Sequence, residues 1–259
     1  MKRVLVIAGY DPSGGAGLLM DIKMLTLLGI KTASIPTALT FQNSQVFEDW
    51  IPMNRKDFEK MLKLTFEDMP ISGVKIGMLA QADLVSLTSF YLKRYRGQLE
   101  WIVYDPVLRA TLEKELYRGP LFLEVVEKEL FPLVDFLTPN LREAEIITGL
   151  SLKTLEDFKE AAKKLYSQGV KHILIKGERN KGRIFSYYFY EGSLKKTFSV
   201  KELPFEFHGT GCAFSSLLLG YLLKREEPLV AIKEAQRRLS FYIKKASFQA
   251  EKGRLNLIF

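Results

Sequence analysis

The sequence predicts an α/β fold with a mostly parallel central sheet and an antiparallel edge. Short apolar segments alternate with longer segments of helical periodicity, the pattern of a parallel sheet covered by helices. The first apolar segment, Arg3–Ala8 (RVLVIA), has no polar alternation, which is typical of a strand buried on both faces. Residues 184–190 and 195–200 are separated by Glu191–Leu194 and predict a hairpin, hence the antiparallel edge.

The expected elements alternate along the chain. Strands are predicted at 3–8, 32–38, 72–76, 101–105, 134–138, 172–176, 184–190 and 195–200. Helices are predicted at 15–29, 55–68, 81–96, 118–130, 140–148, 154–168, 211–224 and 228–250. Because helices separate the early strands, we expect a parallel sheet with helices on both faces.

Length and composition favour a single domain over residues 1–259, since no linker, low-complexity tract or internal repeat is visible. No apolar stretch reaches the roughly 18–20 residues that a membrane span needs, and no signal-peptide pattern is present. Cys212 is the only cysteine, so no intrachain disulfide is possible and a cytoplasmic location is expected. The two histidines, His172 and His208, form no Cys/His cluster with zinc spacing.

The charge balance is basic, with a formal net charge of +8 and a pI of about 9.3. The basic residues are interleaved with acidic ones and form no long block or nucleic-acid motif. We therefore expect no nucleic-acid and no membrane partner. The excess positive charge would instead favour the approach of anionic small molecules such as ATP and phosphorylated substrates.

A glycine-rich turn follows the first strand, at Gly9–Gly17 (GYDPSGGAG), and leads into a helix. Its glycine spacing differs from the dinucleotide-binding fingerprint, and no Gly-Lys-Ser/Thr closes it as in a Walker A loop. Asp21 lies within the following helix among apolar residues. A carboxylate on the buried side of a helix needs a partner; alternatively Asp21 is solvated or caps a neighbouring group.

A second glycine motif, His208–Cys212 (HGTGC), opens an apolar helical run that extends to Gly220. The unpaired amides and the dipole of a helix start form a site for phosphate or another anion, so Gly209, Thr210 and Gly211 are candidate catalytic residues. Cys212 stands at the rim, where a helix N-terminus is expected to lower the pKa of its thiol.

Six further candidates share one position: they follow the predicted strands directly. These residues are Asp11, Gln42, Met78, Asp105, Asn140 and Lys176. Because ligands of open parallel sheets bind at the carboxyl ends of the strands, we expect these side chains to line one cleft.

These motifs resemble those of the hydroxymethylpyrimidine/phosphomethylpyrimidine kinases, which belong to the ribokinase-like superfamily. The matching segments occur in the family's order and are Ala8–Leu25, Thr37–Ser44, Lys75–Leu79, Asp105–Val107, Thr138–Ala144, Ile173–Gly177 and His208–Cys212. The resemblance implies a three-layer αβα sandwich. It also implies two successive phosphoryl transfers from ATP, first to hydroxymethylpyrimidine and then to its monophosphate, which supply thiamine synthesis.

The resemblance implies roles at the phosphate end of the cleft. The amides of residues 209–212 would stabilise the transferred phosphoryl group, and Lys176 would contribute positive charge near the ATP phosphates. Asn140 and Glu143 form an Asn-x-x-Glu pattern that would bind the nucleotide and organise Mg²⁺, with Asp105 as a further metal residue. The same pattern also fits a helix-capping arrangement, and the two interpretations are compatible.

At the pyrimidine end, the resemblance assigns substrate contacts to four residues. Gln42 can donate and accept hydrogen bonds in one plane along an aminopyrimidine edge, and Asp21 can accept one from the amine. Met78 offers a polarisable surface to the ring face, and Gly9 allows close approach. The alternative for Met78 is ordinary core packing.

Cys212 is expected to take the proton of the substrate hydroxyl in the first transfer, as its thiolate. The second transfer starts from an anionic phosphate and needs no strong base. The alternative is that Cys212 is a small residue filling a helix N-terminus. The resemblance further suggests a homodimer or a larger homo-oligomer.

Two departures from the family pattern concern the substrate range: Leu108–Lys114 replaces a segment rich in small residues and glycine, and Glu178-Arg179 replaces Gly-His. An enzyme that acts mainly on the monophosphate is compatible with them. A pyridoxal or pyridoxine kinase and a non-catalytic pyrimidine-binding module are the alternative functions.

Overall fold

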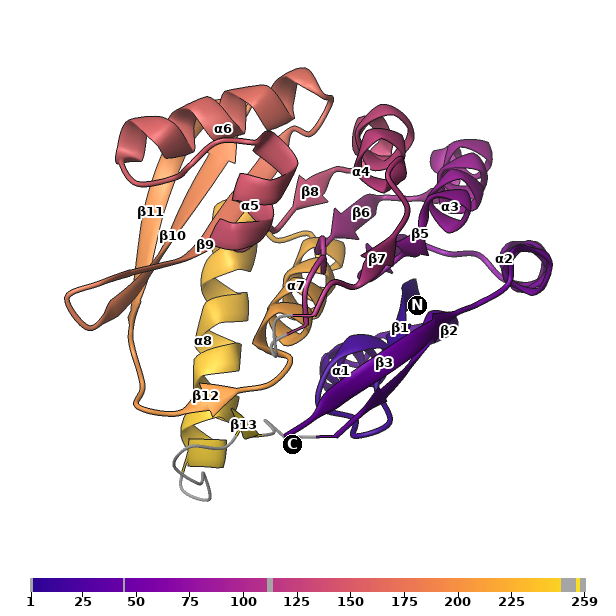
Figure 1. Ribbon diagram of the computed structural model, residues 1–259, viewed down its shortest axis with the longest axis horizontal. Coiled ribbons are helices and arrows are strands. Elements are labelled where there is room, and N and C mark those ends of the chain that lie inside the picture. The colour runs from indigo at the N-terminus through magenta and orange to yellow at the C-terminus, as the bar shows by residue number, and fades with distance from the viewer. Residues whose placement is uncertain (1, 44, 111–113, 248–254, 257–259) are drawn as a thin grey trace.

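A twisted central sheet organises the chain in the computed structural model, which describes residues 2–43, 45–110, 114–247 and 255–256 (Figure 1). Its strands are β1 (Arg3–Tyr10), β2 (Lys31–Gln42), β3 (Phe47–Pro52), β4 (Gly73–Ile76), β6 (Trp101–Tyr104), β8 (Phe136–Leu137), β9 (His172–Asn180), β10 (Arg183–Tyr190) and β11 (Ser193–Lys201). Within the described residues these nine strands follow the order β11-β10-β9-β8-β6-β4-β1-β2-β3.

The centre of the sheet is parallel and both edges are antiparallel. Strands β2, β1, β4, β6, β8 and β9 pair in parallel along this order. Strands β10 and β11 continue antiparallel beyond β9, and β3 pairs antiparallel with β2 at the opposite edge. The predicted α/β fold class is therefore confirmed, with one antiparallel edge more than expected.

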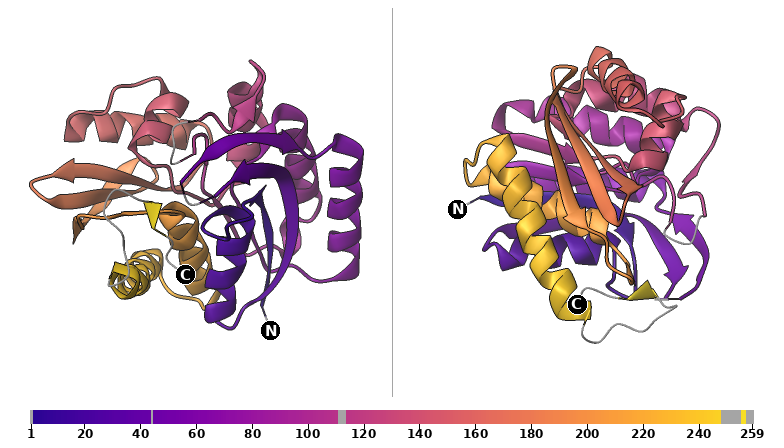
Figure 2. Two further views of the ribbon diagram at one scale, coloured as in Figure 1. Left: turned by 60° about the horizontal axis from the view of Figure 1, so that its bottom comes forward. Right: turned by 90° about the vertical axis from the view of Figure 1, so that its left-hand side faces the viewer.

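Helices cover both faces of the sheet and complete three layers (Figure 2). One face carries α1 (Gly17–Leu27), α7 (Thr210–Leu223) and α8 (Pro228–Ser247). The other face carries α2 (Arg55–Asp68), α3 (Ala82–Arg94), α4 (Phe122–Val125), α5 (Leu141–Thr148) and α6 (Leu155–Ser167).

The uniformly apolar sequence of β1 is explained by helices on both of its faces. Val4 and Val6 belong to the apolar core beneath α1, α7 and α8, whereas Leu5 and Ile7 belong to the core beneath α2 to α6. Successive side chains of a strand point to opposite faces, so a strand with helices on both faces needs apolar residues at every position.

Short elements connect these layers. They are the 3₁₀ turns η1 (Arg96–Gln98) and η3 (Phe131–Leu133), the π-helical turn η2 (Val126–Leu130), and the strands β5 (Ala80–Gln81), β7 (Tyr117–Arg118), β12 (Glu206–Phe207) and β13 (Leu255–Asn256). Strand β5 pairs with β7, and β12 pairs with β13.

The predicted helix 118–130 was wrong in two respects: the helix begins later, and it is not α-helical throughout. Gly119 has a φ of 95°, which ends the preceding strand in a turn, and α4 begins only at Phe122. After four residues α4 passes into the π-helical turn Val126–Leu130. The predicted helix 228–250 is α8, which is described to Ser247; residues 248–250 lie outside the described residues.

The antiparallel edge beyond β8 is larger than predicted. Strand β9 extends to Asn180 and turns at Lys181-Gly182, whose φ values of 49° and 70° are those of a two-residue type I′ turn. The β10–β11 turn is Glu191-Gly192, with φ values of 49° and 71°, so this loop has two residues instead of the expected 191–194. Strand β3 was not predicted at all.

Candidate active site

One large cavity of about 1850 Å³ opens at the carboxyl ends of the parallel strands. The predicted site residues meet there, with the single exception of Asp21. The ones that line it are Gly9, Gln42, Met78, Asp105, Asn140, Glu143, Lys176, Gly209, Thr210, Gly211 and Cys212. They come from segments far apart in the sequence, which confirms that the residues following the strands converge.

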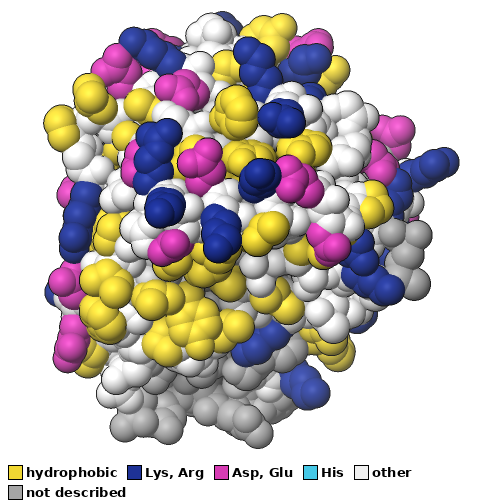
Figure 3. All heavy atoms as spheres, turned by 90° about the vertical axis from the view of Figure 1, so that its right-hand side faces the viewer, with side chains coloured by type: hydrophobic (Ala, Val, Ile, Leu, Met, Phe, Trp, Pro, Cys, Tyr) yellow, Lys and Arg dark blue, Asp and Glu magenta, His cyan; other side chains and the backbone are white. Residues whose placement is uncertain are grey.

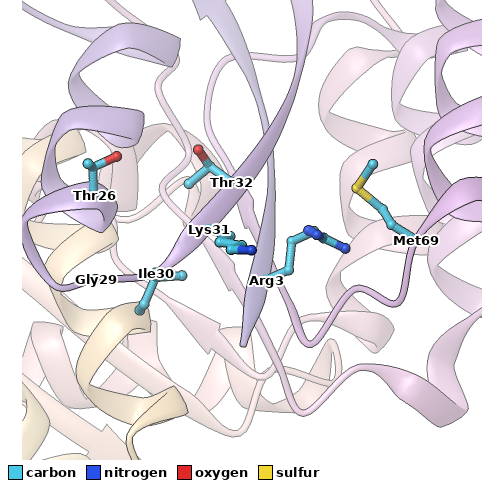
Figure 4. A pocket seen from close by; sticks show the side chains of 7 residues that line it. All are labelled: Arg3, Thr26, Gly29, Ile30, Lys31, Thr32 and Met69. Atoms are coloured by element: carbon cyan, nitrogen blue, oxygen red, sulfur yellow. The ribbon is translucent and has the colours of Figure 1, made fainter. Parts of the chain in front are cut away.

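A smaller hollow of about 520 Å³ lies at the opposite, amino end of β1 (Figure 4). Arg3 and Lys31 line it from adjacent strands, together with Thr26, Thr32 and the backbone at Gly29. No carboxylate and no glycine-rich turn is among the residues that line it, so the candidate site is the larger cavity.

The start of α7 forms the anion-binding part of the cavity. Gly209 caps the helix in the left-handed conformation with a φ of 73°, and no side chain satisfies the first amides. A Cβ atom on Gly209 would lie 1.9 Å from the Gly15 carbonyl oxygen, so only glycine fits. The two glycine-rich segments therefore contact each other through their backbones, and the amides of the first turn remain available to a ligand.

Asp11 and His208 hold the same two segments together through side chains. His208 Nε2 lies 3.0 Å from Asp11 Oδ2, and both residues are buried. The Asp11 carboxylate also accepts hydrogen bonds from the Ser13 and Ala16 amides, at 2.9 and 2.8 Å. Burial opposes the charge of Asp11, but hydrogen bonds from His208 and Ser13 hold its pKa below the usual value. The sequence analysis placed Asp11 in the cleft but gave His208 no role.

Lys176 and Asp105 form an ion pair next to this helix start. Lys176 Nζ lies 3.0 Å from Asp105 Oδ1, which also accepts a hydrogen bond from Thr138 Oγ1 at 3.0 Å. A Cβ on Gly211 would lie 3.3 Å from Asp105 Oδ2 and 3.8 Å from Lys176 Nζ. Burial opposes ionisation of Asp105, yet the Lys176 charge holds its pKa below the usual value. A fixed cation and a carboxylate therefore face the first turn of α7.

Asn140 and Glu143 form the capping box at the start of α5. The Asn140 side chain accepts from the Glu143 amide at 2.9 Å, and Glu143 Oε2 accepts from the Asn140 amide at 2.8 Å. Burial and the negative charge of Asp105 raise the pKa of Glu143 to about 8. The expected capping arrangement is thus confirmed, and its glutamate lies in the cavity wall near a second carboxylate.

At the other end of the cavity, Gln42 lies at the end of β2, and its Nε2 donates to Thr40 Oγ1 at 2.9 Å. Met78 follows β4 and is buried, and a Cβ on Gly9 would lie 2.8 Å from its sulfur. A side chain at position 9 would therefore displace the Met78 thioether, and both residues line the cavity.

Cys212 lines the cavity with 7% of its surface exposed. The expectation of a lowered thiol pKa was wrong: burial raises the pKa of Cys212 to about 12, although the charge of Lys75 opposes this rise. The desolvation of the buried thiolate therefore outweighs the opposing charge of Lys75, and the resting side chain is a thiol.

Asp21 is fully buried beneath the cavity and is not among its lining residues, so the expected contact with the pyrimidine needs correction. Its Oδ2 lies 2.9 Å from Lys75 Nζ, and its Oδ1 accepts from Ser216 Oγ at 2.8 Å. The partner that a buried carboxylate requires is thus Lys75, which was quoted within a motif but given no role.

A further part of the cavity lies between the β9–β11 edge and α8, and no site residue was predicted there. It is lined from the edge strands by Arg179, Arg183 and Lys201, and from α8 by Gln236 and Lys244. The available signal was the basic run Arg179–Arg183, which belongs to the basic residues that the charge pattern gave no site. Its tight turn at Lys181-Gly182 places these cations along the cavity.

The described part of the chain contains no group of three or more His, Cys, Asp and Glu side chains arranged to hold a metal ion. Asp105 and Glu143, the two acidic residues that the sequence assigned to Mg²⁺, both line the cavity. Among the described helices, none has the length and apolar character required to cross a membrane.

Comparison with known proteins gives consistent matches over most of the chain. The family model described as phosphomethylpyrimidine kinase matches residues 11–257. A hydroxymethylpyrimidine/phosphomethylpyrimidine kinase from Aquifex aeolicus is 39% identical over 233 residues, which are 90% of each chain.

Two solved structures illustrate the structural likeness. The phosphomethylpyrimidine kinase of Clostridium difficile superimposes with a TM-score of 0.80 at 30% identity and covers 94% of this chain and 100% of its own. The pyridoxal kinase of Staphylococcus aureus in complex with AMP-PCP and pyridoxal gives a TM-score of 0.82 at 27% identity, with 93% and 87% of the two chains covered.

Proposed function

Because this chain belongs to the phosphomethylpyrimidine kinase family, we propose that it transfers a phosphoryl group from ATP to hydroxymethylpyrimidine and a second one to the resulting monophosphate. The product would be the pyrophosphate used in thiamine synthesis. The observation that carries this proposal is a single cavity with two unlike ends: an anion-binding helix start beside an ion pair, and a small glutamine-methionine surface.

The phosphoryl group would be transferred at the start of α7. The amides of Gly209, Thr210, Gly211 and Cys212 have no side-chain cap, and they would bind the three equatorial oxygens as charge develops on them. Lys176 would add positive charge beside the same oxygens. Removing one preorganised donor or cation from such a site typically costs about 10²–10³ in rate.

Mg²⁺ is the expected metal, and the residues present fit it. Asp105 and Glu143 are both buried in the cavity wall, and burial together with the charge of Asp105 raises the pKa of Glu143 to about 8, so a divalent cation between them would offset the repulsion between two carboxylates. Asp105 and Glu143 would hold Mg²⁺, with Asn140 fixing Glu143 through the capping box and contributing to the nucleotide site. When bound, Mg²⁺ neutralises charge on the nucleotide phosphates.

The pyrimidine would bind between Gln42, Met78 and Gly9. The Gln42 amide nitrogen has two donors, of which one binds Thr40 Oγ1, so one donor and the carbonyl acceptor would remain to match a ring nitrogen and the exocyclic amine of an aminopyrimidine. Met78 would contact the ring face, and the absence of a side chain at Gly9 leaves room for it.

Pyridoxal or pyridoxine phosphorylation is the second candidate function, because a pyridoxal kinase superimposes on this chain as well as a pyrimidine kinase does. The Gln42–Met78 pair favours the pyrimidine. A non-catalytic pyrimidine-binding module is disfavoured by the intact set of Lys176, Asp105 and open helix amides.

A parallel assay with the purified protein, ATP and Mg²⁺ tests the proposal. Hydroxymethylpyrimidine, its monophosphate and pyridoxal are offered separately, and kcat/KM is measured from products resolved by mass. We expect both pyrimidines to be converted and pyridoxal to react more slowly. Turnover of pyridoxal alone would favour the second candidate, and binding of the pyrimidine without transfer would favour the non-catalytic module.

We further propose that two copies of the chain associate through the face that carries β2 and β3. Figure 3 shows apolar side chains gathered on this side of the molecule. Leu39, Phe41, Val46 and Ile51 are 38–48% exposed there, and β3 forms the end of the sheet. A second copy is the occupant to expect, because a self-associating face buries the same apolar residues twice. The proposed activity and the lone cysteine agree with the expected cytoplasmic location.

A further inference from the structure

A fully buried ion pair lies beneath the cavity and contacts neither the phosphate end nor the pyrimidine end of the proposed site. Lys75 Nζ and Asp21 Oδ2 are 2.9 Å apart, and both side chains are 0% exposed. Neither atom has a well-aligned hydrogen-bond partner among the described residues. The ammonium is therefore held by charge and leaves donor capacity unused, which is costly in a protein interior.

The ion pair contacts α7, the helix whose first turn forms the proposed phosphoryl site. Asp21 lies on α1 and Lys75 on β4, and Ser216 on α7 donates to Asp21 at 2.8 Å. Ser216 follows Cys212 by four residues, one helical turn, so the two side chains lie on the same side of α7. A Cβ on Gly77, which lines the cavity, would lie 3.1 Å from Lys75 Nζ. The ammonium thus lies directly beneath the cavity floor.

The charged residues that act on Cys212 lie on a helix, on a strand and after a second strand. Lys75 on β4 is the main positive charge that favours its thiolate, and Asp21 on α1 and Asp105 after β6 oppose it. Lys176 on β9 reaches to 3.8 Å from a Cβ at Gly211, the residue before Cys212. Replacing a buried ion pair by apolar side chains of similar volume is often neutral or stabilising for a fold. The pair at positions 21 and 75 is therefore better explained by its electrostatic effect than by stability.

We propose that Lys75 is a positioning residue for the first transfer: its buried ammonium supplies the positive charge against which the Cys212 sulfur accepts the proton of the substrate hydroxyl. This inference rests on the proposed function. In the step, the resting thiol has first lost its proton to water. The hydroxymethyl oxygen then bonds to the γ-phosphorus, the bond from that phosphorus to the bridging oxygen breaks, and ADP leaves with its electron pair. The hydroxyl proton passes to the Cys212 thiolate.

The second transfer has a different requirement. Its attacking oxygen belongs to a phosphate that is already anionic, so no base is needed and Lys75 should have little effect on it. The ratio of the two rates in one variant is therefore a readout that a folding defect does not move, because both transfers use the same folded molecules.

The test compares two variants that break the same ion pair. Lys75→Met removes the positive charge and keeps the length of the side chain, whereas Asp21→Asn removes the negative charge and keeps the oxygen that Ser216 contacts. If the charge matters, the two variants have opposite effects on Cys212. If the pair is only structural, both variants affect Cys212 in the same direction.

Alkylation by iodoacetamide at a fixed pH near 8.5 measures this directly, since Cys212 is the only cysteine and mass spectrometry then reports one site. We expect slower alkylation in Lys75→Met and faster alkylation in Asp21→Asn, each by about tenfold for every unit that the thiol pKa moves. Lys75→Arg retains the charge and should remain close to the unchanged protein.

The kinetic arm uses the two pyrimidines. In Lys75→Met, kcat for the first transfer should fall by about tenfold or more relative to kcat for the second, with little change in either KM. Alkylation shifts in the same direction, or an unchanged ratio of the two transfers, would overturn the inference.

The two arms also separate this inference from the proposed function. Alkylation needs neither ATP nor pyrimidine, so it reports on Lys75 even if the unchanged protein lacks kinase activity. If Lys75→Met fails to fold, Asp21→Asn still decides: alkylation no faster than in the unchanged protein would contradict the electrostatic role.

Discussion

Lys176 is the residue on which the electrostatics of the site depend most directly. It pairs with Asp105 at 3.0 Å and lies beside the first turn of α7. We predict that Lys176→Met lowers kcat of both transfers by about 10²–10³, because each needs the same positive charge at the transferred group. The measurement is steady-state kinetics with each pyrimidine.

The matched control is Lys196→Met, which makes the same chemical change at an exposed position on β11 outside the cavity. Its kinetics should equal those of the unchanged protein. A loss in only one of the two transfers for Lys176→Met would show that they do not share one phosphoryl site.

Gly209 allows the two glycine-rich segments of the site to contact each other through their backbones. We predict that Gly209→Ala destabilises the protein by at least about 1–3 kcal/mol, since a left-handed φ of 73° and a contact at 1.9 Å from the Gly15 oxygen must both be relieved. Urea unfolding monitored by circular dichroism measures the loss.

Gly97→Ala is the control, because Gly97 has no positive φ and no atom within 4 Å of an added Cβ. Equal stability of the two alanine variants would mean that the contact between the glycine-rich segments is not rigid.

Cys212 tests the division between the two transfers. We predict that Cys212→Ala lowers kcat of the first transfer by about 10²-fold, the usual contribution of a proton-accepting group, and leaves the second within about threefold. Product formation from each pyrimidine checks this. Equal losses in both transfers, or none in either, would favour the alternative that Cys212 only fills the helix start.

The chemical character of individual residues was easier to predict from the sequence than their partners in space. Of the two interpretations of Asp21, a buried carboxylate with a partner is confirmed and a solvated or capping residue is wrong; the partner, Lys75, lies on a strand distant in sequence. The pKa of Cys212 was predicted in the wrong direction because one sequence shows a helix start but not the depth of its burial.

Strand β9 contains a buried histidine, His172, that makes the stability of the fold depend on pH. His172 packs against the Phe136 ring, its Nδ1 lies 2.8 Å from the Tyr188 hydroxyl, and burial lowers its pKa to about 4. The unfolded chain, with an ordinary histidine pKa near 6.5, binds more protons between about pH 6.5 and pH 4. The free energy of unfolding therefore falls as the pH is lowered through this window.

We predict that His172→Phe, which retains the ring packing and cannot be protonated, loses less unfolding free energy between pH 7 and pH 4.5 than the unchanged protein does. Denaturant unfolding at the two pH values measures the difference. The same loss in both proteins would place the acid sensitivity elsewhere.

The elements that the sequence predicted well are those with continuous apolar patterns, such as β1 and α7, whose burial is nearly complete. Strand β3 was missed because its six residues, FEDWIP, alternate imperfectly and end in proline. The β9–β10 turn was missed because Lys181 adopts a positive φ, which its residue type does not indicate.

The apolar face over β2 and β3 is the proposed contact between two copies of the whole molecule. We predict that the protein sediments as a dimer and that Phe41→Asp, which places a charge in this face, shifts it toward the monomer. Sedimentation velocity at several concentrations measures the change. The control is Phe90→Asp, on a phenylalanine of α3 that is 55% exposed, against 48% for Phe41, and is not one of the four patch residues.

The convergence of the site was predictable because it follows from topology: residues after parallel strands meet at one end of the sheet. The part of the cavity beside α8 was not predictable in the same way. It depends on where the β9–β11 edge packs relative to a helix that comes later in the chain, and no local pattern records that placement.

One measurement tests most directly the claim that a single cavity carries out two successive transfers. A limiting amount of hydroxymethylpyrimidine is mixed with the protein, excess ATP and Mg²⁺, and the products are followed over time by mass spectrometry. We expect the monophosphate to form first and then to be converted to the pyrophosphate. Accumulation of the monophosphate without further conversion, or no phosphorylation of the alcohol, would contradict it.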